Sequence, residues 1–350
     1  MTILFAILLF SILIFVHELG HFLAAKTFGV RVNEFSMFMG PAIFKKQVGD
    51  TLYALRCIPI GGYCAMEGED EDTDDPRSFQ KAAWWKRLII LVAGSAMNLV
   101  AGFLILAIVF APAKQFVVPV IDSAETGCTV VREGGLQIGD RFLELDGEKI
   151  YVQSDFSMLL QLNPGDTHDI VVLRNGEKIK FDDYKMEMHL FPGEEIKRYG
   201  FSFGVVDATF GNKLQYVINS GWNVVRSVRL SLQMIVSGQA GLKDMTGPVG
   251  IVQMMSDTAA ASPTAMDAFL NMLYIGGFIA INLAVMNLLP IPALDGGRVV
   301  GLLLTTGIET ITRKKLDPKY EGYIHGIGMI LLLALMAVIL FKDIFVIFKR

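Results

Sequence analysis

The stretch from residue 17 to residue 21 reads HELGH and holds three side chains that can do chemistry together. On a helix, His17 and His21 lie four residues apart on one face, so their two imidazoles can bind one metal ion. Glu18 is one residue further round the helix, where a carboxylate can act as a general base on water rather than as a ligand. The pattern predicts a catalytic divalent metal site, and the chemistry of these ligands suits zinc.

This motif lies within an otherwise apolar run, Ile3–Ala25. A carboxylate at the centre of a membrane helix costs roughly 2.5–3.5 kcal/mol on insertion scales. The alternative to a metal site is a pair of buried histidines bonded to neighbouring helices, which leaves Glu18 unexplained. A metal ion accounts for all three residues, because the cation offsets the carboxylate and uses the imidazole lone pairs.

A catalytic zinc ion usually has three protein ligands, so HELGH leaves the site one ligand short. The best candidate is Asp295, in the segment NLLPIPALDGGRVVGLL. Pro290 and Pro292 must end the preceding helix, and Gly296-Gly297 permits a sharp turn. Broken backbone between apolar helices is tolerated only where it lines a cavity or is covered by protein. The alternative role for Asp295 is to cap a helix that begins near Gly297.

The remaining histidines are weaker ligand candidates. His168 and His189 fall in a part of the chain without membrane character, and His325 opens the last apolar run, where we expect a surface group. The cysteines have no zinc-ribbon spacing, so Cys57, Cys64 and Cys128 are interpreted as structural or incidental thiols rather than ligands.

Composition indicates a membrane protein. The 350-residue chain is 53% hydrophobic and only 19% charged, whereas globular proteins are about a quarter charged. The net charge of −4 gives no reason to expect nucleic acid as a partner. The first apolar run is longer than the core of a signal peptide and no Lys or Arg precedes it, which favours a retained helix. Four runs are long enough to span a bilayer: Ile3–Ala25, Leu88–Phe110, Ala268–Leu289 and Ile324–Phe341.

The segments between these spans predict four parts. Residues 1–111 form a first membrane half with the HELGH helix, a β-hairpin loop on the cytoplasmic side and the second span. Residues 112–205 form a small β-rich domain, in which Asp146-Gly147 and Asn175-Gly176 are hairpin turn signals. Residues 206–264 hold an amphipathic helix, lying on the membrane or packed on the bundle, and a connecting loop. Residues 265–350 form the second membrane half.

Basic residues indicate the orientation of the chain. Arg313, Lys314, Lys315 and Lys319 lie between the third and fourth spans, which places that loop in the cytoplasm and the β-rich domain outside. Lys342, Lys349 and Arg350 follow the fourth span on the other side of the membrane and argue mildly against this orientation.

The motifs resemble those of the intramembrane site-2 zinc metalloproteases, and the closest subgroup is the bacterial regulator-of-sigma-E protease type. HELGH matches the first motif and NLLPIPALDG, from Asn287 to Gly296, matches the second. Gly94 and Asn98 in AGSAMNLVAG match the glycine-and-asparagine motif of the second span. GGYCAMEGED resembles the membrane-associated β-loop, TGPVGI resembles the stretch before the third span, and GLQIGDRFLELDGEKI resembles part of a PDZ domain.

The resemblance implies one Zn²⁺ per chain held by His17, His21 and Asp295, with Glu18 as base and acid. The candidate substrate-binding residues are Asn287, Asn98, Gly61 and Gly62. Asn287 would hold the substrate backbone or the oxyanion, or alternatively bond two helices together. The fold expected is an α-helical polytopic membrane protein of about four transmembrane helices, with a membrane-associated β-hairpin region and one inserted extracytoplasmic PDZ-like domain.

The implied activity is zinc-dependent cleavage of single-span, type II-like membrane proteins in regulated intramembrane proteolysis, for example of an anti-sigma factor or remnant signal peptides. The expected location is the bacterial cytoplasmic membrane, with the active site toward the cytoplasm. The PDZ-like domain would bind peptides, filter substrates by size or provide a docking surface. Three alternatives are a transporter, which would favour paired repeats, a scaffold whose metal site is vestigial, and a different membrane zincin that cuts soluble peptides. The last would share HELGH but would not predict the LDG segment.

Overall fold

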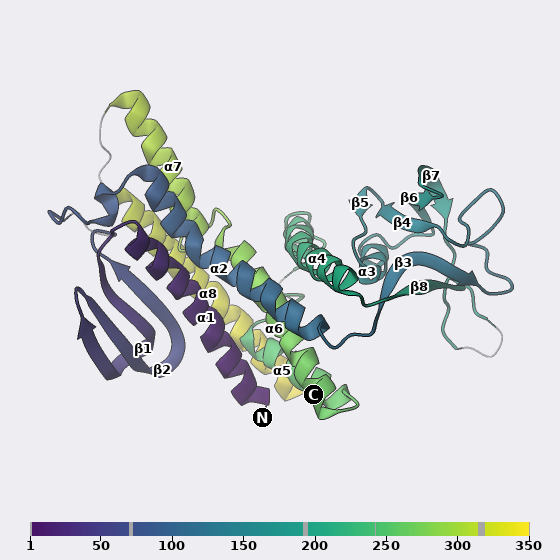
Figure 1. The fold of residues 1–350 in the computed structure, drawn as a ribbon, viewed down its shortest axis with the longest axis horizontal. Coiled ribbons are helices and arrows are strands. Elements are labelled where there is room, and N and C mark those ends of the chain that lie inside the picture. Colours follow the sequence, from purple (N-terminus) through teal and green to yellow (C-terminus); the bar gives the residue numbers. More distant parts are fainter. Residues whose placement is uncertain (1, 70–72, 192–194, 242, 314–318, 350) are drawn as a thin grey trace. The chain divides into compact units, whose positions relative to one another are not determined.

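The computed structural model describes residues 2–69, 73–191, 195–241, 243–313 and 319–349 (Figure 1). The chain divides into two compact units, one of Met1–Ile105 with Ser227–Arg350 and the other of Leu106–Arg226. The first unit holds the HELGH motif and Asp295, and the second holds the β-rich module. The domain boundaries expected from the sequence stay predictions.

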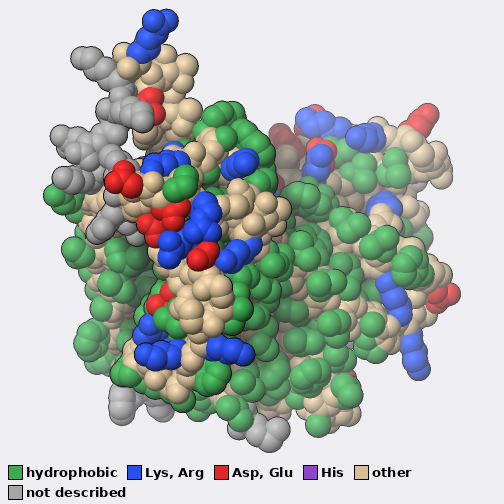
Figure 2. Space-filling model, turned by 60° about the vertical axis from the view of Figure 1, so that its left-hand side comes forward, with side chains coloured by type: hydrophobic (Ala, Val, Ile, Leu, Met, Phe, Trp, Pro, Cys, Tyr) green, Lys and Arg blue, Asp and Glu red, His purple; other side chains and the backbone are tan. Residues whose placement is uncertain are grey.

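Four helices in the described part of the chain are long and apolar enough to cross a membrane, as the sequence predicts. They are α1 (Thr2–Thr27), α2 (Trp84–Phe110), α6 (Ala265–Asn287) and the Gly322–Phe345 part of α8 (Lys319–Lys349). Large apolar side chains such as Ile327, Ile330 and Phe341 of α8 are exposed. On the face drawn in Figure 2, Lys, Arg, Asp and Glu side chains gather together and broad hydrophobic areas lie beside them. Exposed apolar surface of this extent is typical of helices that face lipid.

Glycines let the apolar helices pack closely. A Cβ atom on Gly20 of α1 would lie 2.4 Å from the carbonyl oxygen of Ala93 in α2. A Cβ on Gly102 of α2 would lie 2.4 Å from Ile281 of α6. Both distances are too short for any larger residue: the atom met at Gly20 belongs to the backbone of α2, and the one met at Gly102 is Cγ1 of the Ile281 side chain. Such close approach at small residues is common between membrane helices. They bring α1, α2 and α6 into one bundle.

A long hairpin of β1 (Val32–Val48) and β2 (Thr51–Met66) follows α1, where the sequence predicts β-structure. Residues 34–37 pair with residues 62–65 on one side and with residues 52–55 on the other, and residues 44–48 pair with residues 51–55. The 62–65 segment therefore lies at the edge of this sheet. Aromatic rings join the hairpin to α1: Phe35 lies 4.9 Å from Phe22 and 5.8 Å from Phe15, between ring centroids.

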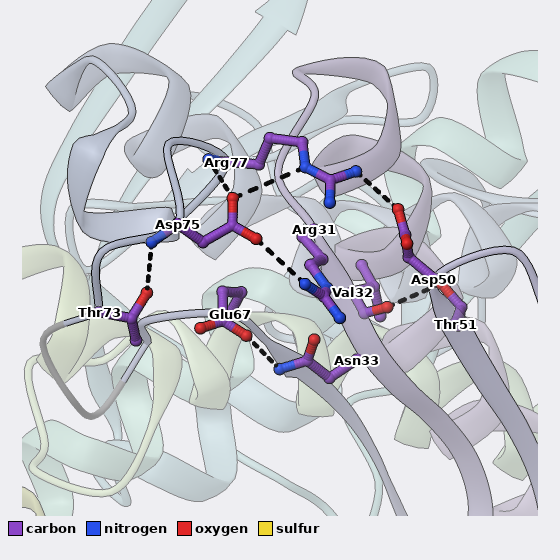
Figure 3. A network of polar contacts seen from close by, with 9 residues as sticks. All are labelled: Arg31, Val32, Asn33, Asp50, Thr51, Glu67, Thr73, Asp75 and Arg77. Carbon is purple, nitrogen blue, oxygen red and sulfur yellow. Dashed lines mark hydrogen bonds and ion pairs between the residues drawn. The ribbon is translucent and has the colours of Figure 1, made fainter.

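Polar contacts join the start of β1 and the turn between β1 and β2 to the loop that follows β2 (Figure 3). Three contacts join the two segments: Asn33 with Glu67 at 2.7 Å, Arg31 with Asp75 at 3.1 Å, and Arg77 with Asp50 at 2.6 Å. The Arg77 guanidinium holds the pKa of the Asp50 carboxyl below its usual range. Residues 70–72 of the acidic stretch lie outside the described residues, but Glu67 and Asp75 anchor its ends.

The segment that carries Asp295 is broken, as the two prolines predict. Helix α6 ends at Asn287, residues 288–294 are irregular, and α7 (Asp295–Thr312) begins at Asp295. A Cβ on Gly296 would lie 2.3 Å from the carbonyl of Leu288, and one on Gly297 would lie 2.4 Å from that of Ile291. Only glycine permits the start of α7 to fold back against this segment.

The TGPVGI stretch forms the start of a helix, α5 (Pro248–Ala261). The carboxylate of Asp343 in α8 accepts hydrogen bonds from the backbone N–H groups of Gly247, at 3.0 Å, and Gly250, at 2.9 Å. A carboxylate there satisfies free donors at the helix start and complements the helix dipole. The two glycines leave room for it, because a Cβ on Gly247 would lie 2.8 Å from the Asp343 oxygen.

The second unit is built on an antiparallel six-stranded sheet in the order β7-β6-β4-β3-β8, with β5 paired to β4. Its strands are β3 (Gln115–Ala124), β4 (Arg141–Leu145), β5 (Glu148–Lys149), β6 (Thr167–Arg174), β7 (Glu177–Lys185) and β8 (Phe201–Asp207). The turns expected at Asp146-Gly147 and Asn175-Gly176 are present, and all four residues have the positive φ that such turns require. The likeness of this unit to a PDZ domain stays a prediction.

Two helices pack in the second unit. Phe156 of α3 (Gln153–Leu162) contacts Phe142 and Phe203 of the sheet, at 4.8 and 5.3 Å between ring centroids. The amphipathic helix α4 (Phe210–Val236) is bonded to α3 through Arg226, whose guanidinium lies 3.1 Å from the buried carboxylate of Asp155. Part of α4 therefore packs on the β-rich unit, a partner that the sequence reading did not consider.

The side of the membrane on which each loop lies stays a prediction. Of the basic residues behind it, Lys314 and Lys315 lie outside the described residues. Arg313 ends α7 in the left-handed conformation, with φ of 56°.

Candidate metal centre

Three side chains from two distant parts of the chain meet inside the first unit. Nε2 of His17 and Nε2 of His21 project from α1, and Oδ2 of Asp295 projects from the first residue of α7. His17 Nε2 lies 3.2 Å from Asp295 Oδ2, and His21 Nε2 lies 3.4 Å from it. The two imidazole nitrogens are 3.2 Å apart. In the part of the chain that the structure describes, these residues form the one group with the donor types and spacing to hold a metal ion.

The three donor atoms fit a zinc ion. Zinc binds imidazole nitrogen and carboxylate oxygen at about 2.0–2.2 Å in a tetrahedron, which places neighbouring donors about 3.3 Å apart. The observed triangle, with sides of 3.2, 3.4 and 3.2 Å, has this size. Asp295 Oδ2 is also buried without a hydrogen bond, and a cation would compensate it. Three protein ligands leave the fourth position open, as in catalytic zinc sites.

The other ring nitrogen of each histidine faces a neighbour on α2. His21 Nδ1 lies 2.8 Å from the carbonyl oxygen of Ile90, so it carries the hydrogen and donates it. This bond leaves the lone pair of His21 on Nε2, toward Asp295, and fixes the plane of the ring. His21 is buried, and both of its ring nitrogens have a neighbour there: Nδ1 contacts the Ile90 carbonyl and Nε2 faces Asp295.

Asn98 plays the corresponding part beside His17. Its side-chain amide lies 3.5 Å from His17 Nδ1, and its Oδ1 atom is buried without a partner. Because a ligating His17 needs its lone pair on Nε2, its Nδ1 carries a hydrogen, and a half-turn of the Asn98 amide would offer Oδ1 as the acceptor. This position behind His17 favours orientation of a ligand. The expected contact of Asn98 with substrate stays a prediction.

Gly94 provides the space for both imidazoles. A Cβ atom on Gly94 would lie 2.2 Å from His21 Nε2 and 2.8 Å from His17 Cε1. The glycine of the second-span motif is therefore explained by the ring volume that must fit between α1 and α2. The motif spacing from Gly94 to Asn98 is one helical turn, which places the gap and the amide on the same face of α2.

Gly94→Ala is expected to displace the histidine rings and to weaken zinc binding by at least about tenfold, because a contact of 2.2 Å cannot be accommodated without moving His21. Zinc affinity measured by competition with a chromogenic chelator checks this. Gly307→Ala in α7 is the matched control, since a Cβ there meets no atom within 4 Å. Equal zinc affinity of the two variants would contradict this account of Gly94.

Glu18 lies between the cluster and the edge of β2. A Cβ on Gly62 would lie 3.4 Å from Glu18 Cγ and 3.3 Å from Ile14, and the backbone of Cys64 is within hydrogen-bonding reach of the Glu18 carboxylate. Gly61, the other candidate glycine, has φ of 76° and adjoins Met39. Both glycines therefore shape the sheet edge beside Glu18.

Cys64 is near Glu18 but is not one of the three residues whose donor atoms lie together. Burial raises the pKa of its thiol, and the neighbouring carboxylates of Glu18 and Glu69 act in the same direction. The Cys64 sulfur is not part of the group of donor atoms formed by His17, His21 and Asp295.

The geometry around Asp295 bears on the two roles considered for it, and the role of metal ligand stays a prediction. The residue at the cap of α7 is Leu294, and no side chain makes a capping hydrogen bond there. Asp295 is the first helical residue, and its carboxylate is directed at the histidines. Asn287 is the last residue of α6 and is half-buried; no hydrogen bond of its side chain is found among the described residues, so both roles proposed for it stay open.

Sequence reasoning missed one residue near the site. His325 of α8, expected as a surface group, lies against the broken segment, and its Nδ1 accepts a hydrogen bond of 3.1 Å from the backbone N–H of Ala293. Its position next to a run of apolar residues offered no sign of this partner. The other two histidines belong to the second unit, where His168 contacts Asp146 at 2.9 Å and His189 contacts Thr129 at 2.7 Å.

Comparison with known proteins gives a match over nearly the whole chain. The model of the family described as "Peptidase family M50" matches residues 5–335. A Clostridium perfringens protein named "Putative zinc metalloprotease" is 36% identical over 98% of both chains. A Clostridium acetobutylicum protein of the same description is 34% identical over 98% of this chain and 97% of its own. The zinc metalloprotease RasP of Shouchella clausii is 28% identical over 98% of both chains.

Proposed function

The chain belongs to peptidase family M50 and is a metalloprotease, and we propose that it is a zinc-dependent intramembrane endopeptidase that cleaves single-span membrane proteins within or near their transmembrane segment. The observation that carries this proposal is the meeting of His17, His21 and Asp295 among helices apolar enough to span a membrane. Ionisable groups in such surroundings mark functional sites, because burying them without compensation is costly.

His17, His21 and Asp295 are the ligands of one zinc ion in this proposal, and Glu18 is the catalytic base and acid. When bound, zinc supplies a Lewis acid that polarises the scissile carbonyl and lowers the pKa of water toward about 7. The Glu18 carboxylate takes up the proton of the attacking water and delivers it to the nitrogen of the leaving amine. The contacts of the two rings with Ile90 and Asn98 hold them in position throughout.

The edge of the β1–β2 sheet is the proposed binding site for an unwound segment of the substrate. A helical transmembrane segment hides its peptide bonds, so it must unwind before Glu18 can act on it. Residues 62–65 pair with residues 34–37 on one side, and no strand pairs with their other side among the described residues. An extended substrate added at this edge would have its backbone groups paired and would lie beside Glu18. Gly61 and Gly62 keep the edge free of bulky side chains there.

The setting proposed for this activity is the bacterial cytoplasmic membrane. Its support is the set of four apolar helices and the match to bacterial relatives in Clostridium and Shouchella. The active site would face the cytoplasm and the β-rich unit the opposite side, in accord with the basic residues after α7. Type II-like single-span proteins, such as an anti-sigma factor or remnant signal peptides, are the proposed substrates, and the β-rich unit would bind peptides or restrict substrate size.

The proposal is tested with the purified chain in detergent or liposomes and a single-span reporter protein. Cleavage is expected to stop after treatment with a zinc chelator and to return when zinc is restored, because the proposed ligands need the ion to polarise the scissile carbonyl. Fragments are followed by gel electrophoresis and the cut is located by mass spectrometry. Cleavage that persists in the metal-free protein, or a cut far outside the transmembrane segment, would contradict the proposal.

A further inference from the structure

The irregular segment between α6 and α7 has few backbone N–H groups that can form hydrogen bonds within the segment. Pro290 and Pro292 have no N–H, and the turns Ile291 N–H to Leu289 O (2.7 Å) and Leu294 N–H to Ile291 O (3.1 Å) use two of the donors that remain. Ala293 is left in the left-handed conformation, with φ of 81°, which a residue with a Cβ adopts rarely. Such a conformation persists only where surrounding contacts maintain it.

Helix α8 supplies those contacts. The N–H of Ala293 donates to Nδ1 of His325, at 3.1 Å. One turn further along α8, Gly328 lies against Pro292, and a Cβ on Gly328 would come within 2.3 Å of the proline ring and 2.8 Å of its carbonyl. His325 and Gly328 are three residues apart and so share one face of the helix. Together they form one surface of α8 that contacts residues 292 and 293.

Asp295 follows Ala293 by two residues and begins α7. The direction of its carboxylate therefore depends on the backbone conformation at Ala293 and Leu294, together with the close packing of Gly296 and Gly297 against the same segment. A flip of Ala293 out of the left-handed region would turn the start of α7 and withdraw Oδ2 from His17 and His21. A hydrogen bond to an otherwise unpaired N–H among apolar helices opposes that flip, because a free donor there is costly.

We propose that His325 is a positioning residue: by accepting the Ala293 hydrogen bond it holds the broken segment so that Asp295 stays on the two imidazoles of HELGH. This inference rests on the proposed metal role of Asp295. To accept, His325 must keep a lone pair on Nδ1, which requires the tautomer with hydrogen on Nε2. The effect acts through the backbone and involves no contact of His325 with substrate or metal.

The test compares three variants of the full-length chain. His325→Ala removes the acceptor. His325→Asn restores one, because the asparagine Oδ1 occupies nearly the place of the histidine Nδ1. Ile327→Ala is the control for shortening a side chain of α8, since Ile327 is exposed and two residues away. Zinc dissociation constants are measured by chelator competition, and the visible spectrum of the cobalt-substituted protein reports the geometry of the ligands.

His325→Ala is expected to raise the zinc dissociation constant about 10–100-fold, the range found for contacts that orient a ligand, and to change the cobalt spectrum. His325→Asn is expected to stay within about threefold of the wild type, as is Ile327→Ala. Wild-type affinity and spectrum in His325→Ala would overturn the inference, and so would equal losses in His325→Ala and His325→Asn. Absence of zinc binding by the wild-type chain would instead refute the proposed function.

Discussion

Glu18→Gln is expected to bind zinc as the wild type does and to cleave a single-span substrate about 10²–10⁴-fold more slowly, the usual contribution of a general acid–base group. Glutamine has nearly the same size as glutamate, so the packing of this side chain beside Gly62 is preserved. Its amide cannot take up a proton at neutral pH. The loss should therefore fall on the chemical step and leave the metal site intact.

Zinc content by atomic absorption and initial cleavage rates, measured on one preparation, separate these two properties. Glu133→Gln is the matched control, since Glu133 is exposed on the β-rich unit. Fragments of membrane proteins that accumulate in cells with the active chain and are missing with Glu18→Gln would identify natural substrates. Retained activity in Glu18→Gln would end the assignment of Glu18, and zinc lost from this variant would make the residue a ligand.

Asp295→Asn is expected to weaken zinc binding by at least about 100-fold and to reduce cleavage to the same extent. The carboxylate supplies both an oxygen donor and the negative charge that offsets the cation. A neutral amide of the same shape supplies at best a weaker oxygen. The loss should exceed that of residues which only orient a ligand, for which 10–100-fold is usual. Affinity is measured by chelator competition, with cleavage rates followed at increasing zinc concentration.

Asp257→Asn is the control for this variant, since Asp257 is an exposed aspartate of the same unit whose carboxylate contacts Gln253. Partial recovery of cleavage at high zinc concentration would identify the defect as one of metal affinity. An unchanged zinc stoichiometry and affinity in Asp295→Asn would remove Asp295 from the ligand set and leave the HELGH histidines without their proposed third partner.

Local patterns predicted the membrane helices closely. Apolar runs of about 20 residues depend only on the chain's own sequence, and α1, α2, α6 and α8 lie where these runs occur. The end of α6 and the two tight turns of the β-rich unit were equally predictable, since proline lacks an N–H and Asp-Gly or Asn-Gly tolerates positive φ. The existence of the β1–β2 hairpin was predicted, but its extension to Val48 was not, because bulges interrupt the alternation of apolar residues.

The four-residue spacing of the histidines in HELGH by itself places the two imidazoles on one helix face, because residues i and i+4 of a helix lie on the same side. The same local reading could not choose between ligand and cap for Asp295, since either role places an aspartate at the start of a helix. The position of Asp295 beside the histidines depends on how α7 folds back on residues 288–291 and on how closely α1 and α2 approach at Gly20 and Gly94. Asn98 gains its partner only where α2 meets α1, and His325 gains its partner only where α8 meets the broken segment at Ala293. Hydropathy carries no information about which faces of such helices make these contacts.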